Sequence, residues 1–149
     1  MDVAVSVKGV ISDPVTEAHS VVLEEESATR TLTIWVGTVE GNAIRSAIEG
    51  VSSARPLTHE LLQQVLARLH AEVKRVVVHD VRDNTFYASI VLDVAGREIV
   101  LDARPSDAIA LALRAGSPIY ARRDLLAGSE SDRVQAWLED LKPTDFETP

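Results

Sequence analysis

The sequence of 149 residues contains no cysteine, which excludes disulfide bonds, thiolate metal sites and cysteine nucleophiles. Aromatic residues make up only 4% of it, so the core must be built from valine, isoleucine, leucine and alanine. No apolar run approaches the roughly 20 residues that span a bilayer, and the N-terminus lacks a signal-peptide pattern. These features predict a soluble, cytoplasmic protein without a membrane partner.

A strongly basic composition is also absent. The net charge of −8 argues against nucleic-acid binding driven by the phosphate backbone alone. Residues 128–149 hold six acidic and two basic residues, a net of −4, and the other −4 is spread over residues 1–127. This distribution leaves room for a local basic groove in the first 127 residues. Glycine-rich phosphate loops are missing, and the four histidines lack the spacing of a metal site.

The pattern along the chain predicts one α+β domain over residues 1–127. Apolar alternation or β-branched content predicts strands at 2–12, 21–23, 32–36, 73–81, 85–94, 98–102 and 117–121. Three- and four-residue apolar spacing predicts helices at 39–48, at 58–69 and from Pro105 onward. Hairpins interrupted by helices indicate a mixed, largely antiparallel sheet with helices packed against it. Residues 128–149 are expected to form an acidic extension with a short helix at 134–141.

Charged residues gather where the strand at 98–102 leads into the third helix. With Arg104 as N-cap, Pro105 occupies the first helical position and Asp107 lies in the first turn. One interpretation is structural, with Asp107 facing the positive end of the helix dipole and Asp102 pairing with Arg104. The other is functional, with both aspartates holding a divalent cation and Arg104 facing an anionic substrate. Oxygen ligands of this kind suit Mg²⁺ or Mn²⁺.

Four more residues at helix starts are candidates. Glu40 supplies a third metal-binding carboxylate if two helix starts converge, although dipole complementarity explains it equally well. Arg55 precedes a proline and is held extended, which suits phosphate binding, or else it pairs with an acid on the surface. His59 is placed to meet the same phosphate. Because Ser106 has no base nearby in the sequence, it is expected to bind substrate rather than attack it.

The stretch 102–120, Asp-Ala-Arg-Pro-Ser-Asp-Ala-Ile-Ala-Leu-Ala-Leu-Arg-Ala-Gly-Ser-Pro-Ile-Tyr, closely resembles the signature of the bifunctional nuclease domain family. Segments 34–44, 55–62 and 86–88 also resemble the family, so the likeness covers roughly residues 1–127. It implies an α+β fold, action on DNA and RNA, and a homodimer. The sequence departs from the family pattern at Thr33 and at Gly41-Asn42. Since glycine weakens a helix by about 1 kcal/mol relative to alanine, the second departure bears on the helix that carries Glu40.

Two hypotheses follow. The first is metal-assisted hydrolysis of phosphodiester bonds in nucleic acid, a hydrolase activity. Its catalytic residues are Asp102, Arg104 and Asp107, its substrate-binding residues are Arg55, His59 and Ser106, and its ligands for Mg²⁺ or Mn²⁺ are Glu40, Asp102 and Asp107. The second is a non-catalytic, dimeric binding or regulatory module, in which the charges at the helix starts form an internal network. The first is the leading hypothesis, and the acidic net charge and the lack of a recognised catalytic triad or metal motif are the reasons for the second.

Overall fold

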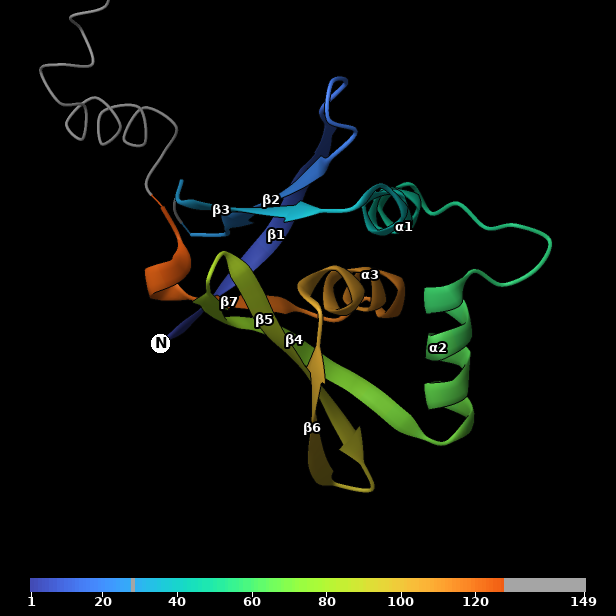
Figure 1. Cartoon of the computed structure of the whole chain (residues 1–149). Coiled ribbons are helices and arrows are strands. Elements are labelled where there is room, and N and C mark those ends of the chain that lie inside the picture. The colour runs from blue at the N-terminus through green and yellow to red at the C-terminus, as the bar shows by residue number, and fades with distance from the viewer. Residues whose placement is uncertain (28, 128–149) are drawn as a thin grey trace, which may run out of the picture.

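The computed structural model describes residues 1–27 and 29–127, which form a seven-stranded mixed sheet with three helices packed against it (Figure 1). This confirms the predicted α+β class. The elements in chain order are β1 (Asp2–Ser12), β2 (His19–Glu25), β3 (Thr31–Val36), α1 (Thr38–Glu49), α2 (Thr58–Arg68), β4 (Ala71–Arg82), β5 (Thr85–Val94), β6 (Arg97–Ala103), α3 (Pro105–Ala115), β7 (Ile119–Arg122) and a 3₁₀ turn, η1 (Arg123–Leu125).

The strand that comes last in the chain, β7, lies in the middle of the sheet. The order is β3-β2-β1-β7-β4-β5-β6, so β7 joins an N-terminal half to a C-terminal half. Ile119 of β7 pairs with Val5 in antiparallel β1 and with Val76 in parallel β4. Because α3 directly precedes β7, this insertion holds α3 over the centre of the sheet (Figure 1). The start of α3 therefore lies where both halves of the sheet can reach it.

The core lies between the sheet and α3. Five consecutive residues of α3, from Ala108 to Ala112, are buried, which is why the sequence of this helix is apolar on nearly every side. Val76, Val78 and Ile90 face it from the sheet. The small side chains of α3 allow close packing, which suits a protein with so few aromatic residues. No helix among the described residues is long and apolar enough to cross a membrane.

The helix starts are close to those predicted. Arg104 is the N-cap of α3 with Pro105 at its first position, as expected. The N-cap of α2 is Leu57, whose N–H donates to the Glu60 carboxylate at 3.1 Å. The acidic extension and its predicted helix at 134–141 lie outside the described residues.

Candidate functional site

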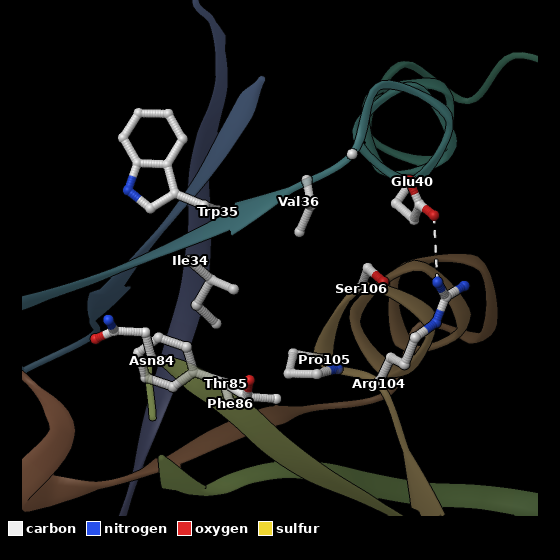
Figure 2. Close-up of a pocket in the computed structure, with 11 residues that line it drawn as sticks. Ile34, Trp35, Val36, Glu40, Asn84, Thr85, Phe86, Arg104, Pro105 and Ser106 are labelled. Atoms are coloured by element: carbon white, nitrogen blue, oxygen red, sulfur yellow. Dashed lines mark hydrogen bonds and ion pairs between the residues drawn. The ribbon is translucent and has the colours of Figure 1, made fainter. Parts of the chain in front are cut away.

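The starts of α1 and α3 converge on the Arg104 side chain. The Arg104 guanidinium donates from Nε to Asp107 Oδ2 at 2.8 Å. It also donates from Nη1 to Glu40 Oε1 at 3.2 Å, a contact that Figure 2 shows. Glu40 lies in the first turn of α1 and Asp107 in the first turn of α3, as predicted. The convergence on which a role for Glu40 depends is thus present. Sixty-four residues separate Glu40 from Arg104, so only the fold brings them together.

The start of α2 reaches the same place through His59. Its Nε2 lies 3.0 Å from Asp107 Oδ1, so both carboxylate oxygens of Asp107 are engaged. The connection between α1 and α2 is held against α3, where Arg114 Nη1 donates to the Val51 carbonyl at 2.9 Å. Glu40, Arg104, Asp107 and His59 therefore form one chain of contacts, the Arg104 network, built on three helix starts.

The electrostatics of the network keep its charges in place. Burial raises the pKa of Asp107, but hydrogen bonds from Arg104 and His59 outweigh it and hold that pKa below the ordinary value of 3.8. The hydrogen bond to Asp107 in turn raises the pKa of Arg104, with a smaller contribution from Glu40. At neutral pH Asp107 is therefore an anion and Arg104 a cation. An ionised Asp107 favours the His59 tautomer whose Nε2 carries the proton.

Two clefts open on either side of Arg104. The first, the Ser106 cleft, has a volume of about 300 Å³ and runs between β3, the tip of the β4–β5 hairpin and the start of α3 (Figure 2). The second, the His59 cleft, has a volume of about 360 Å³ and lies between α1, the start of α2 and α3. Glu40 and Arg104 line both clefts. A bound group in either cleft would therefore meet the same guanidinium.

Asp102 does not join the network. In β6 it pairs with Ser89, whereas its neighbours Leu101 and Ala103 pair with Ile90 and Ala88, which face the helices. Successive side chains of a strand point to opposite faces, so Asp102 is directed to the face of the sheet away from the helices. It is exposed there. The structure therefore does not place Asp102 beside Asp107, and the ion pairs of Arg104 within the described residues are with Glu40 and Asp107 instead.

The other predicted residues are placed unequally. His59 and Ser106 line the two clefts, one in each. Arg55 is exposed on the connection between α1 and α2 and lines neither cleft. Within residues 1–27 and 29–127, no group of three or more histidine, aspartate or glutamate side chains is placed to hold a metal ion. A site with three carboxylate ligands is thus not assembled by Glu40, Asp107 and Asp102.

Some residues of the site had no chemical signal in the sequence. Ile34, Asn84 and Phe86 line the Ser106 cleft, although they come from a strand and a hairpin far from the helix starts. The pairing of His59 with Asp107 spans 48 residues. The resemblance of residues 34–44 and 86–88 to a known family was the one hint that these segments belong with the helix starts.

We expect Asp107→Asn to lower thermal stability in a pH-dependent way. The pKa of Asp107 is lowered in the folded protein, so its ionised form stabilises the fold above the unfolded value of 3.8. This contribution is lost as the pH falls through the lower folded pKa. The difference in melting temperature between wild type and variant should be constant above about pH 5 and shrink below about pH 4. A difference that stays constant down to about pH 2 would contradict this electrostatic role.

Comparison with known proteins identifies a family match. The family model of the bifunctional nuclease domain matches residues 21–133. An uncharacterized protein of Mycobacterium tuberculosis is 37% identical over 143 residues, covering 83% of this chain and 85% of the relative. Bifunctional nuclease 2 of Oryza sativa subsp. japonica is 31% identical over 110 residues, covering 71% of this chain and 34% of the rice protein. The chain thus spans about a third of the length of the rice protein.

Proposed function

Because the chain belongs to the bifunctional nuclease domain family, we propose that it hydrolyses phosphodiester bonds in DNA and RNA with the help of a divalent cation. The observation that carries this proposal is the Arg104 network, which sets an arginine, two carboxylates and a histidine at the mouths of two clefts. These are the groups that phosphodiester hydrolysis needs, namely a cation for the phosphate and a base for water.

Arg104 binds the phosphate. A guanidinium presents several N–H donors in a planar fork, which matches the non-bridging oxygens of a phosphodiester. The Arg104 side chain is 63% exposed although it makes two ion pairs, so an incoming phosphate can reach it. Charge that develops on the phosphorus oxygens during hydrolysis is stabilised by donors already in position.

His59 moves the proton and Asp107 positions it. With the proton on Nε2 held by Asp107 Oδ1, the lone pair of Nδ1 is left to accept a proton from water. Within the described residues, the hydrogen bond of the His59 ring is made through Nε2. The ionised Asp107 also stabilises the imidazolium that forms. This role goes beyond the substrate contact that the sequence predicted for His59.

A divalent cation would bind this site together with the substrate rather than to the protein alone. Mg²⁺ is commonly held by one or two carboxylates together with phosphate oxygens and water, rather than by a complete set of protein ligands. Glu40 and Asp107 flank Arg104 and would supply those carboxylates, while the Asp102 side chain points to the other face of the sheet. When bound, Mg²⁺ or Mn²⁺ neutralises the phosphate and acidifies a bound water.

The test is hydrolysis of single-stranded DNA and RNA in Mg²⁺, Mn²⁺ or EDTA. The wild type is expected to cleave both polymers with a metal ion and to stop in EDTA. Asp107→Asn removes the charge that orients His59, so we expect a loss of about 10²-fold or more. Glu49→Gln also removes one carboxylate, at the exposed end of α1, and should leave the rate unchanged. Activity that survives both EDTA and Asp107→Asn would overturn the proposal.

The second candidate, a non-catalytic dimeric module, is favoured by different observations. The two carboxylates of the Arg104 network are already paired with Arg104, as in a structural network. One side of α2 exposes three apolar residues at four-residue spacing, with Leu61 53%, Val65 46% and Leu69 68% exposed. Apolar patches of this kind mark contact surfaces, so we propose that two copies of the chain meet there. Sedimentation equilibrium should then give a mass near twice 16.2 kDa. A cytoplasmic location also stays a prediction.

A further inference from the structure

Ser106 is a buried polar residue with no partner. It is only 6% exposed, yet its hydroxyl makes no hydrogen bond within residues 1–27 and 29–127. It lines the Ser106 cleft and lies between Val36 and Pro105 there (Figure 2). Ser106 Oγ is not one of the fully buried polar atoms without a partner in the described residues, so it still meets water in the cleft, and a ligand that enters would replace that water. Ser106 is therefore placed as a donor for something that enters this cleft.

The backbone N–H groups at the start of α3 also lack hydrogen-bond acceptors. The α3 N-cap, Arg104, makes no side-chain capping hydrogen bond, and the first-turn N–H groups of Ser106 and Asp107 have no acceptor inside the helix. These groups carry the positive end of the helix dipole, where anions bind favourably. The Arg104 guanidinium brings one positive charge to the rim of the cleft, which it shares with the carboxylates of Glu40 and Asp107. Its remaining N–H donors and its exposed side chain are what an incoming anion would meet.

The far side of the cleft is apolar. Ile34 and Phe86 lie across the cleft from Arg104 and Ser106 (Figure 2). Asn84, at the hairpin tip, adds an amide with both donors and an acceptor. Trp35 also lines the cleft, but its indole points away from Ile34, so we take the Phe86 ring as the contact for a base (Figure 2). A small inorganic anion would contact only the polar side of the cleft and would make no contact with Ile34 or Phe86.

We propose that the Ser106 cleft binds one nucleotide unit of the substrate, with its phosphate at Arg104 and Ser106 and its base against Phe86. The volume of about 300 Å³ is at the small end of ligand-binding pockets and suits a single nucleotide. A base can enter such a cleft only after it has left its stack, so single-stranded nucleic acid is the preferred substrate. This inference deepens the proposed function and rests on it for the identity of the polymer.

The experiment separates binding from cleavage by using adenosine 5′-monophosphate, which has no phosphodiester bond. Titrations of the full chain in EDTA with the monophosphate, adenosine and inorganic phosphate are followed by amide chemical shifts. We expect saturable shifts at Asn84, Phe86 and Ser106, and at least about tenfold tighter binding of the monophosphate than of either fragment. Ser106→Ala should weaken monophosphate binding about tenfold and leave adenosine binding unchanged. Ser53→Ala, on the exposed α1–α2 connection, is the matched control and should change neither.

The wild-type titration decides the proposal even where a variant folds poorly. Shifts confined to other residues, no saturable shift, or inorganic phosphate binding as tightly as the monophosphate would overturn the nucleotide cleft. Binding of the monophosphate in a chain that never cleaves nucleic acid would support the cleft and contradict the proposed hydrolysis. Cleavage of nucleic acid without monophosphate binding would support the proposed hydrolysis and contradict the nucleotide cleft. The failure of one proposal is therefore distinguishable from the failure of the other.

Discussion

Replacing Arg104 by glutamine is expected to reduce hydrolysis of single-stranded nucleic acid by about 10²-fold or more. Arg104 lines both clefts and holds the carboxylates of Glu40 and Asp107. Its loss removes the phosphate-binding charge and leaves two acidic groups facing the substrate phosphate without compensation. Initial rates on DNA and RNA oligonucleotides measure the effect. Arg104→Gln removes a contact to the substrate as well as contacts that stabilise the fold. The loss of rate should therefore be larger than the drop in melting temperature alone would cause.

The matched control is Arg68→Gln. Arg68 is an exposed arginine at the end of α2, so this variant changes the net charge equally without touching either cleft. Its rate should stay within about twofold of the wild type, since distant surface charges are largely screened at ordinary salt concentrations. Equal losses in the two variants would mean that net charge matters and the position of Arg104 does not.

Gly41→Ala is expected to destabilise the fold by about 1–2 kcal/mol, although alanine is the better helix former. A Cβ at position 41 would lie 2.6 Å from Cβ and Cγ of His19, which is buried on β2 against the start of α1. The clash therefore outweighs the gain of about 1 kcal/mol in helix propensity. Urea unfolding measures the change. Gly9→Ala, where nothing lies within 4 Å of an added Cβ, is the control and should cost little.

A second substitution tests the cause. In a His19→Gly background both the ring and its Cβ are gone, so Gly41→Ala should become neutral or stabilising by up to about 1 kcal/mol. A loss that is the same in both backgrounds would show that the His19 side chain is not what requires glycine at position 41. The departure from the family pattern at Gly41 thus has a physical explanation, because glycine at this position makes room for the buried His19 side chain.

The local structure was largely predictable from the sequence. The alternation in residues 2–12 gave the bounds of β1, and the Arg-Pro pair gave the start of α3. These features depend on neighbours within a few residues. The insertion of β7 between β1 and β4 was not predictable, since a strand of four residues carries no mark of its distant partners. That insertion sets α3 over the centre of the sheet.

The candidate site was predictable in part. Local charge patterns identified Glu40, Arg104 and Asp107 as residues at helix starts, but not the ion pair across 64 residues. The face on which Asp102 lies was predictable from the sequence. The apolar residues Leu101 and Ala103 flank it, so strand alternation turns Asp102 to the opposite face of the sheet. For His59, the sequence suggested a phosphate contact and gave no sign of Asp107. The partners of charged residues follow from tertiary packing, which single-sequence patterns do not contain.

The most direct test of the account is whether nuclease activity belongs to this chain and to the Arg104 network. Wild type, Asp107→Asn and Arg104→Gln are purified identically, and cleavage of single-stranded RNA is measured across the size-exclusion profile of each. We expect metal-dependent activity that follows the wild-type protein peak in constant proportion and is at least about 10²-fold lower in both variant peaks. Activity that elutes away from the chain, or that is equal in all three preparations, would contradict the account.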